Sequence, residues 1–566
     1  MRLALAQINP TIGDLERNAR RIIDTIDAAR RAGADLVAFP ELSVCGYPPK
    51  DLLLHEGFTQ ACRNAAEEIG RHTDDICVII GLPLAGPDAN TIYNALLAYE
   101  NGRCVATYRK RLLPTYDVFD EDRYFTPGDA TCVIEVCGIR VGLAICEDLW
   151  RGADAGFSWR YANAADPVKE TADARPHLLL SPSASPFVLH KNLLHRDLLA
   201  RHAAEHRMFV ASVNQVGGND ELVFDGHSAV FAPTGDLIAS SPGFEDDLLV
   251  VDIEPGTKSN RVPDPRVEAP AEELIFKALR LGVRDYLAKT GFSRAVIGLS
   301  GGLDSSVTAA IAAGAIGAAN VTGITMPGPY SSDGARDDAH DLASRLGIRT
   351  LQMPISDVLG AVKRVVDPAF AKIDARPLGD ELPDVAEENV QARIRGLLLM
   401  AHANRTGDIL LTTGNKSEIA VGYCTLYGDM NGGLAVISDV LKTQLYALAG
   451  WMNANAEASG FAGPPIPQST IDKPPSAELA PNQRDDDSLP PYPVLDQIIE
   501  RYVEQRQQPS RIAQETGIDG ALVDRVVRMI DRNEYKRKQM ATGLKVTHVA
   551  FGFGRRMPIA QRWVGG

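Results

Sequence analysis

The chain contains 566 residues, of which 45% are hydrophobic and 23% are charged, and its formal net charge at pH 7 is −15. A single hydrophobic core rarely grows beyond roughly 250–300 residues, so this length predicts several domains. The composition is that of a soluble globular protein. The acidic balance argues against a general nucleic-acid-binding protein, because such proteins usually carry a basic surface.

Neither a targeting segment nor a membrane span is expected. Residues 1–7 turn polar too soon for a signal peptide, and no run approaches the roughly 18 apolar residues of a membrane-spanning helix. The eight cysteines are scattered and include no Cys-x-x-Cys pair. This spacing disfavours a disulfide framework or a zinc site and favours a reducing, cytoplasmic setting.

Residues 1–253 alternate short β-rich runs with helical stretches, and polar residues cluster where the runs end. Such clusters mark sites in open α/β sheets. The pattern predicts an α-β-β-α sandwich. The expected helix covers 15–32, and the expected strands cover 2–8, 36–39, 77–82, 93–99, 140–145, 177–180, 208–213, 228–231 and 248–252.

Three positions in this half have side chains suited to acyl transfer. Glu41 and Cys146 each follow an apolar strand, and Lys110 lies in a short basic run. A cysteine nucleophile needs a base to take its proton and a cation to stabilise the oxyanion. Taken singly, each residue also fits a common structural role: a cap, a solvated charge or a core cysteine.

Three motifs in this order, Phe39-Pro40-Glu41-Leu42, Tyr108-Arg109-Lys110 and Ile145-Cys146-Glu147-Asp148-Leu149-Trp150, resemble the nitrilase-like carbon–nitrogen hydrolases. The resemblance implies that Glu41 is the general base, Lys110 the oxyanion stabiliser and Cys146 the nucleophile that forms a thioester.

Residues 112–125 and 184–187 look like the glutamine-hydrolysing members of that family. By this similarity, Tyr116, Ser185 and Lys191 hold glutamine, with Lys191 suited to its carboxylate. The alternative for these three side chains is ordinary loop polarity.

A linker is expected at 254–270, because the stretch is rich in proline and small polar residues and lacks helical or strand periodicity. It would separate a first domain at 1–253 from a second at 271–566, which opens with a predicted helix at 271–289.

The second half contains a polar turn, Ser300-Gly301-Gly302-Leu303-Asp304-Ser305-Ser306, between an apolar run at 294–299 and an alanine-rich run at 307–313. A strand, a small-residue turn and a helix form a phosphate cradle at a helix N-terminus. Neither the Walker A spacing nor the dinucleotide-binding glycine pattern is present. The alternative is an ordinary glycine-rich turn in which Asp304 or Ser305 caps the helix.

The sequence motif Ser-Gly-Gly-x-Asp-Ser resembles the loop of the N-type ATP pyrophosphatases. The resemblance implies cleavage of ATP between its α and β phosphates and adenylylation of a carboxylate or carbonyl.

The rest of this half has the βαβ rhythm of a doubly wound, Rossmann-like parallel sheet. Expected strands cover 321–326, 349–353 and 409–411, and expected helices cover 333–346 and 386–403. Glu418 could join Asp304 as a Mg²⁺ ligand, since Mg²⁺ is typically held by one or two carboxylates plus substrate phosphates.

Further motifs look like NAD⁺ synthetase: Glu388-Asn389-x-Gln391-Ala392-Arg393-x-Arg395, Thr413-Gly414-Asn415-Lys416-Ser417-Glu418, Tyr427-Gly428-Asp429, Lys442-Thr443 and Glu534-Tyr535-Lys536-Arg537. Together with the nitrilase-like half, the whole chain resembles the glutamine-dependent NAD⁺ synthetases.

This resemblance assigns further roles in the second half. It implies deamido-NAD⁺ contacts from Asn389, Glu418 and Lys536, with Asp429, Asp439 and Lys442 as further candidates. Lys536 could instead be a solvated charge. The implied ATP-binding residues are Gly298, Leu299, Ser300, Gly301, Gly302, Leu303, Asp304, Ser305 and Thr413.

The stretch 474–492 holds five prolines and four acidic residues, which is typical of a mobile loop. Its alternatives are a disordered segment and a lid over the nucleotides.

The resemblance implies a reaction as well as a site. Glutamine supplies ammonia, ATP activates deamido-NAD⁺ as an adenylate, and the products are NAD⁺, AMP, pyrophosphate and glutamate. Neutral ammonia would need an enclosed route, and enzymes of this type place the dinucleotide at a subunit interface, so at least a dimer is expected.

Two other functions remain as alternatives. One is another glutamine-fed ATP-pyrophosphatase ligase that acts on a different carboxylate, nucleotide or tRNA. The acidic balance and the single cysteine after Cys146 disfavour the tRNA form. The other is a non-catalytic nucleotide-binding module, which would be expected to have a broken triad or loop.

Overall fold

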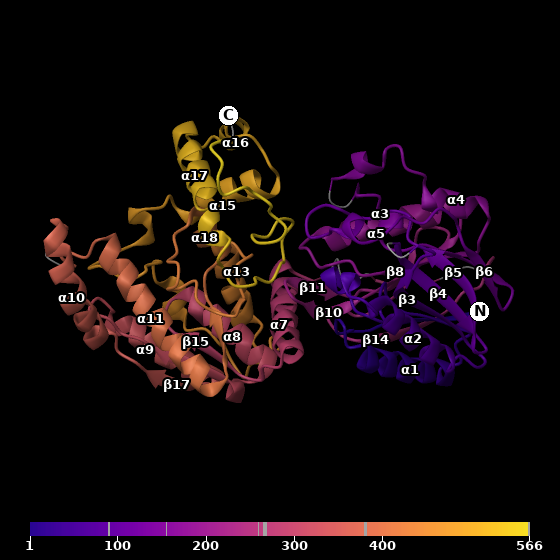
Figure 1. Ribbon diagram of the computed structural model, residues 1–566, viewed down its shortest axis with the longest axis horizontal. Coiled ribbons are helices and arrows are strands. Elements are labelled where there is room, and N and C mark those ends of the chain that lie inside the picture. Colours follow the sequence, from indigo (N-terminus) through magenta and orange to yellow (C-terminus); the bar gives the residue numbers. More distant parts are fainter. Residues whose placement is uncertain (89–90, 154–155, 258–259, 264–268, 379–381, 564–566) are drawn as a thin grey trace. The chain divides into compact units, whose positions relative to one another are not determined.

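The computed structural model describes residues 1–88, 91–153, 156–257, 260–263, 269–378 and 382–563. The chain divides into two compact units, Met1–Ala271 and Glu272–Gly566, and each is considered by itself (Figure 1). Of the expected linker at 254–270, residues 258–259 and 264–268 lie outside the described residues. No helix within the described ranges is long and apolar enough to cross a membrane.

The described part of the first unit contains two six-stranded sheets and a small hairpin, β10 (Val216–Asn219) with β11 (Leu222–Asp225). The first sheet has the order β14 (Asp247–Asp252), β1 (Arg2–Gln7), β2 (Leu36–Ala38), β3 (Cys77–Ala85), β4 (Ile92–Glu100), β5 (Arg103–Arg109). The second has the order β13 (Leu237–Ser240), β12 (Ala229–Phe231), β9 (Phe209–Asn214), β8 (Leu178–Ser183), β7 (Ile139–Leu143), β6 (Val133–Val136).

Alternation along the strands explains how these sheets are layered. On β1, Leu3 and Leu5 belong to the apolar cluster shared by the two sheets, whereas Ala4 and Ala6 pack with the helices on the other face. Successive side chains of a strand point to opposite faces, so one strand serves two layers. Helices α1 (Leu15–Arg31) and α2 (Phe58–Gly70) cover the first sheet, and α4 (Pro167–Asp173) and α5 (Lys191–His206) pack against the second. The predicted α-β-β-α layering is confirmed.

The described residues of the second unit form a five-stranded parallel sheet. Its order is β17 (Arg349–Gln352), β16 (Val321–Thr325), β15 (Ala295–Gly298), β18 (Ile409–Thr412), β19 (Leu434–Ala435). After β15, the chain adds β16 and β17 on one side of it and then β18 and β19 on the other side. The strand order therefore reverses between β15 and β18. Ligands of doubly wound sheets bind at this reversal, beyond the carboxyl ends of the strands. The predicted doubly wound fold is confirmed.

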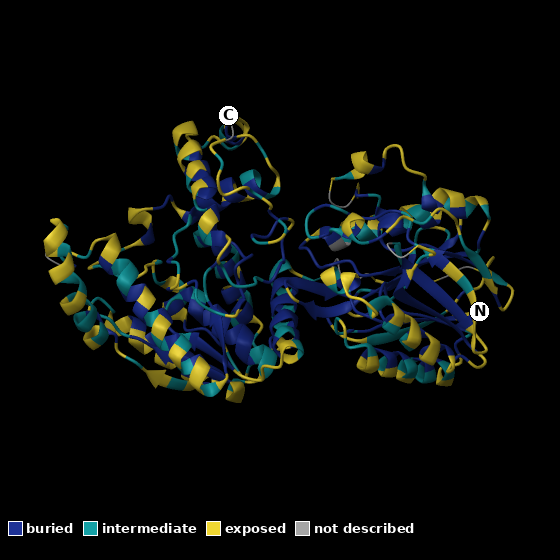
Figure 2. Ribbon diagram, in the orientation of Figure 1, coloured by how far each residue is buried: buried dark blue, intermediate teal, exposed yellow. Residues whose placement is uncertain are grey.

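Helices surround this sheet and extend beyond it, and its strands are mostly buried except for the edge strand β17, which is largely exposed (Figure 2). The longer helices are α7 (Ala271–Thr290), α8 (Leu303–Ile316), α9 (Asp333–Leu346), α10 (Ser356–Phe370), α11 (Val385–Thr406) and α13 (Lys442–Ala454). The remaining ones are α12 (Lys416–Val421), α14 (Gln468–Asp472), α15 (Tyr492–Ile499), α16 (Pro509–Thr516), α17 (Gly520–Arg532) and α18 (Glu534–Arg537).

The structure differs from the sequence expectations at several elements. Six strands were not predicted: β5, β6, β10, β11, β13 and β19. Helix α8 begins at Leu303, inside the polar turn, and its N-cap is Gly302, so the alternative in which Asp304 or Ser305 caps the helix is wrong. The stretch 474–492 has defined structure, with Leu489 and Tyr492 buried, so the alternative of a disordered segment is also wrong.

Candidate active sites

The ends of three strands in the first unit bring Glu41, Lys110 and Cys146 into one buried site. Glu41 follows β2, Lys110 follows β5 and Cys146 follows β7. The Lys110 Nζ lies 2.6 Å from Glu41 Oε1, and both residues are only 1% exposed. The carboxylate is further held by hydrogen bonds from Asn94 Nδ2 at 2.7 Å and from the Ala184 backbone N–H at 3.1 Å. Glu41 therefore has a fixed orientation.

Cys146 occupies a strained backbone position at the start of the short helix α3 (Glu147–Trp150). Its φ of 42° lies in the left-handed region, which costs a non-glycine residue free energy and recurs at functional sites. Burial, together with the negative charge of Glu41, raises the pKa of the Cys146 thiol, and Lys110 opposes that shift. Cys146 is therefore a neutral thiol at rest and needs a base when it attacks.

Glu121 is a buried fourth member of this site that the sequence analysis did not single out. Its Oε1 accepts hydrogen bonds from Lys110 Nζ at 2.8 Å and from the Tyr47 hydroxyl at 2.8 Å. Burial and the charge of Glu41 raise the pKa of Glu121 to about 7, although Lys110 opposes them. Glu121 stands between two other acidic residues in the sequence, Asp120 and Asp122, and nothing in that run distinguishes the buried carboxylate from its more exposed neighbours.

The residues expected to hold glutamine are placed in two neighbouring environments. Ser185 and Lys191 line a small cavity of about 30 Å³ together with Trp150, His195, Asn214 and Asp225. Tyr116 is not among the described residues that line it. The Tyr116 ring stacks on Phe157 at 4.7 Å between centroids, and its hydroxyl donates to Glu147 Oε2 at 2.7 Å.

A cavity of about 700 Å³ opens in the second unit, where β15 and β18 end. It includes every residue expected to bind ATP or deamido-NAD⁺: Gly298 through Ser305, Thr413, Asn389, Glu418 and Lys536. Asp429 and Lys442 also line it, whereas Asp439 is not among the described lining residues. Residues from four separate parts of the chain, 298–305, 389, 413–418 and 536, thus meet at the predicted edge of the sheet.

The turn after β15 is built for close approach of an anion to the backbone. The Ser300 and Ser305 hydroxyls lie 3.1 Å apart, and the Gly302 backbone N–H donates to Ser300 Oγ at 3.2 Å. Gly301 has φ +76°, and a Cβ there would lie 2.0 Å from the Ala335 carbonyl oxygen. Only glycine fits this position, and the turn leads directly into the N-terminus of α8, which attracts phosphate.

Two carboxylates share one buried lysine on the wall of this cavity. Lys442 Nζ contacts Asp304 and lies 3.3 Å from Glu418 Oε1, and Asn415 Nδ2 donates to Asp304 Oδ1 at 2.7 Å. Burial and the charge of Asp304 raise the pKa of Glu418 to about 8. No described group of three or more His, Cys, Asp or Glu side chains is arranged to hold a metal. Two carboxylates do fit Mg²⁺ when phosphate oxygens and water supply its other ligands.

The expected dinucleotide contacts are anchored rather than freely solvated. Lys536 is half-buried, and its Nζ donates to the carbonyl oxygens of Gly422 and Cys424, each at 2.8 Å. Asn389 Oδ1 accepts from the Thr425 hydroxyl at 2.8 Å. Interpreting Lys536 as a simple solvated charge is therefore wrong.

The stretch 474–492 forms one side of the same cavity. Its contacts are Glu478 Oε1 with the Ser332 hydroxyl at 2.8 Å, Gln483 Nε2 with Glu388 Oε1 at 3.1 Å, and the Leu479 carbonyl with Gln391 Nε2 at 3.0 Å. Each of these hydrogen bonds involves a polar group at the surface or at the cavity. The lid expected as one alternative for this stretch stays a prediction, and these surface and cavity contacts are individually weak, as a movable segment would require.

Both halves of the chain match known families. Residues 2–260 match the carbon-nitrogen hydrolase family, and residues 275–540 match the NAD synthase family. The glutamine-dependent NAD⁺ synthetase of Synechocystis sp. is 44% identical over 567 residues, covering 99% of this chain and 98% of that protein. That of Thermotoga maritima is 41% identical over 100% of this chain and 99% of that protein.

The chain belongs to the glutamine-dependent NAD⁺ synthetases.

Solved structures of this family agree. The glutamine-dependent NAD⁺ synthetase of Acinetobacter baumannii, in complex with ADP, is 35% identical, with a TM-score of 0.76 over 100% of this chain and 99% of that chain. The corresponding structure from Cytophaga hutchinsonii, at 23% identity and a TM-score of 0.82, shares the fold over 99% and 98% of the two chains. The resemblance predicted from the motifs is confirmed, and it places the chain in a family that uses ATP.

Replacing Gly301 with alanine is expected to weaken ATP binding about tenfold. The left-handed backbone would cost about 1–2 kcal/mol, and the new Cβ would displace the Ala335 carbonyl. Isothermal titration calorimetry with ATP measures the change. Gly302→Ala is the matched control, because Gly302 has a negative φ and its added Cβ would meet only Ser300 Oγ, at 3.2 Å. Equal effects of the two substitutions would contradict this role for Gly301.

Proposed function

We propose that this chain forms NAD⁺ from deamido-NAD⁺, with ATP as the activating co-substrate and glutamine as the nitrogen donor. The observation that carries the proposal is that one chain contains a buried Glu–Lys–Cys site and a phosphate-cradle cavity, in the order found in its full-length relatives. In this assignment residues 1–253 are the glutaminase domain, 254–270 the linker and 271–566 the synthetase domain.

In the glutaminase half, Cys146 attacks the side-chain amide of glutamine. Its proton passes to Glu41, and the Sγ–C bond forms as the carbonyl oxygen takes up negative charge beside Lys110. The C–N bond then breaks, the proton held by Glu41 leaves with ammonia, and a glutamyl thioester remains. Water, deprotonated by Glu41, resolves the thioester to glutamate. Tyr116, Ser185 and Lys191 hold the substrate in this scheme.

In the synthetase half, a carboxylate oxygen of the nicotinate ring attacks the α-phosphorus of ATP, and pyrophosphate leaves. The turn Ser300–Ser305 and Thr413 hold the phosphates, while Asn389 and Lys536 hold the dinucleotide. Ammonia then attacks the activated acyl carbon, and AMP leaves as NAD⁺ forms. A carboxylate is a poor acyl donor, and adenylylation supplies it with a good leaving group.

Asp304 and Glu418 are the residues that would hold Mg²⁺. Both are oxygen donors facing one cation, Lys442, and a further cation fits this pair because the pKa of Glu418 is already raised. When bound, the ion would screen the charge that accumulates on the leaving pyrophosphate.

The alternative is another glutamine-fed ATP-pyrophosphatase ligase with a different acceptor. The full-length relatives favour deamido-NAD⁺ over another carboxylate.

A split between nitrogen sources tests the assignment. Cys146→Ala is expected to abolish NAD⁺ formation from glutamine while ammonium salts still support it, because only the nucleophile for glutamine is removed. NAD⁺ formation with each nitrogen source measures this. The matched variant is Asp304→Ala, which is expected to lose NAD⁺ formation with both nitrogen sources.

Two outcomes would contradict the assignment. A folded Cys146→Ala protein that failed with ammonium as well would show that the two halves do not divide the chemistry as proposed. Retained synthesis in Asp304→Ala would remove Asp304 from the activating site.

The pKa of Glu121, about 7, predicts an acid limb in glutamine hydrolysis. Below that pH Glu121 gains a proton and its hold on Lys110 weakens, so kcat/KM should fall as the pH drops through about 7. Glu121→Gln is permanently neutral and should be slower and lack this limb. Glutamate release against pH, without ATP or dinucleotide, measures both proteins. If the fall of kcat/KM at low pH were unchanged in Glu121→Gln, that pH dependence would belong to another group.

We also propose at least a dimer, formed through the synthetase domain. Apolar side chains near the dinucleotide site are strongly exposed in the single chain: Val385 is 71% exposed and Leu397 is 61% exposed, both on α11. The double variant Val385→Ser/Leu397→Ser is expected to shift sedimentation velocity toward the monomer. Trp159→Ser, an equally exposed site in the first unit, is the control. A monomeric wild-type protein, or dissociation by Trp159→Ser alone, would refute this interface.

A further inference from the structure

The segment 541–555 lies beyond the residues matched by the NAD synthase family, which end at 540. It is nevertheless built into the interior of the second unit. Leu544, Lys545, Val546 and Thr547 are all buried. A buried lysine and a buried threonine in a segment with little regular structure need a reason, since polar groups are costly to remove from water.

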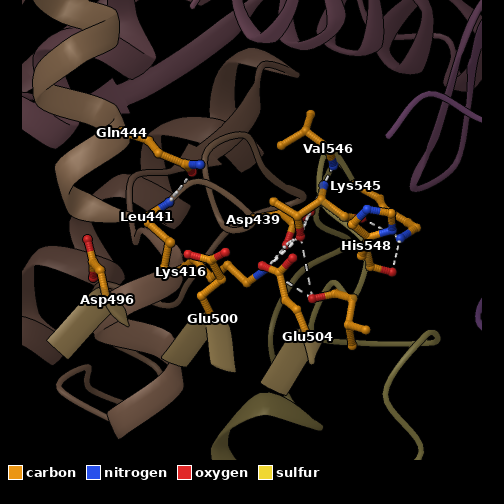
Figure 3. Close-up of polar contacts among 12 residues, drawn as sticks. Lys416, Asp439, Leu441, Gln444, Asp496, Glu500, Glu504, Lys545, Val546 and His548 are labelled. Atoms are coloured by element: carbon orange, nitrogen blue, oxygen red, sulfur yellow. Dashed lines mark hydrogen bonds and ion pairs between the residues drawn. The ribbon is translucent and has the colours of Figure 1, made fainter. Parts of the chain in front are cut away.

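The reason is a polar network centred on Lys416 (Figure 3). The Lys416 ammonium is fully buried and has four partners. They are Asp439 Oδ1 at 2.9 Å, Glu504 Oε1 at 2.7 Å, the Thr547 hydroxyl oxygen at 2.5 Å and the Val549 carbonyl oxygen at 3.0 Å. Two of these partners come from segment 541–555.

Asp439 joins the same segment to the network from the other side. Its Oδ2 accepts the backbone N–H groups of Val546 and Thr547, each at 2.7 Å, and its Oδ1 accepts the Thr547 hydroxyl at 2.8 Å. Burial acts to raise the pKa of Asp439, but Lys416 and Lys545 outweigh it and hold the pKa below its usual value. Asp439 is thus a paired, ionised carboxylate, and this explains its absence from the described lining of the cavity.

Lys416 is the first residue of α12, and its neighbours face the ATP site. Asn415 caps the helix by accepting the Glu418 backbone N–H at 3.0 Å, and its amide donates to Asp304 at 2.7 Å. Ser417 Oγ accepts the Lys442 backbone N–H at 2.9 Å. The residues around Lys416 therefore hold the proposed Mg²⁺ carboxylates and the lysine between them, while Lys416 itself points away from the cavity into the network.

Stability alone does not account for this arrangement. A buried ion pair is often no more stabilising than well-packed apolar residues of similar volume, because both charges lose their hydration. What a charged, multiply hydrogen-bonded lysine does supply is one fixed orientation. That property matters at the start of α12, where Asn415 and Glu418 must meet Asp304.

We propose that Lys416 and Thr547 are positioning residues of the ATP site, and that segment 541–555 sets the placement of Asn415 and Glu418 against Asp304. The proposal rests on the assigned synthetase function for its role in turnover. It assigns a part in ATP activation to a segment outside the matched NAD synthase region.

Thr547→Val tests it with little change in shape, because it removes the hydroxyl that accepts a hydrogen bond from Lys416 and donates one to Asp439. The dissociation constant for ATP in the presence of Mg²⁺, from calorimetry, is expected to rise about tenfold, at the low end of the range for loss of a contact that positions ligand residues. Ammonium-driven AMP formation should show a higher KM for ATP. Glutamine hydrolysis without ATP or dinucleotide should be unchanged. Thr547→Ser keeps the hydroxyl and should restore ATP binding.

A matched control separates positioning from loss of stability. Ile512→Val removes one methylene group from the apolar core of the same unit, in α16, and Ile512 is not among the described residues lining the cavity. It should lower the melting temperature without changing the ATP dissociation constant.

Three results would overturn the inference: an unchanged ATP dissociation constant in Thr547→Val, an equal change in Ile512→Val, or no restoration by Thr547→Ser. Failure of the wild-type protein to make NAD⁺ would instead refute the proposed function, since ATP binding is measured without turnover.

Discussion

In the described parts of the chain, three buried lysines each lie between two carboxylates, and the surroundings of both candidate active sites depend on this arrangement. Lys110 contacts Glu41 and Glu121, Lys442 contacts Asp304 and Glu418, and Lys416 contacts Asp439 and Glu504. Removing such charges from water is expensive unless each is paired. The three clusters differ in how completely their negative charges are balanced by positive ones. That difference separates the Lys110 and Lys442 clusters, where chemistry is proposed, from the Lys416 cluster, which supports the structure.

The Lys416 cluster has a second buried cation, Lys545, and the pKa of Asp439 is held below its usual value. The other two clusters keep an excess negative charge, which adds to the effect of burial in raising the pKa to about 7 at Glu121 and about 8 at Glu418. An unbalanced buried carboxylate is poised to take up a proton or a cation. In the first cluster, the proposed scheme passes a proton to Glu41 while Glu121 stays ionised beside Lys110. In the second cluster, uptake of a cation suits a Mg²⁺–nucleotide complex.

The sequence allowed prediction of residues whose chemistry follows directly from their place after a strand. Glu41, Cys146 and the turn 300–306 each follow an apolar run, and the sheet topology then brings them to a site edge. Glu121, Asp439 and Thr547 could not be found in this way. Their importance arises from burial beside a distant charge, and Thr547 meets Lys416 across 131 positions of the chain. The local amino-acid sequence around either residue carries no information about such a long-range contact.

The excess charge also bears on how Cys146 would be activated. Moving its proton to Glu41 converts a neutral thiol and a carboxylate into a thiolate and a neutral acid, so the net charge of the buried group does not change. The transfer therefore adds no new charge to this buried site, where creating one would be costly. Lys110 loses an ionised partner in Glu41 but keeps Glu121, which holds its ammonium in place beside the thiolate and the oxyanion that follows. In this scheme, Glu121 is what allows Glu41 to change its protonation state without releasing Lys110.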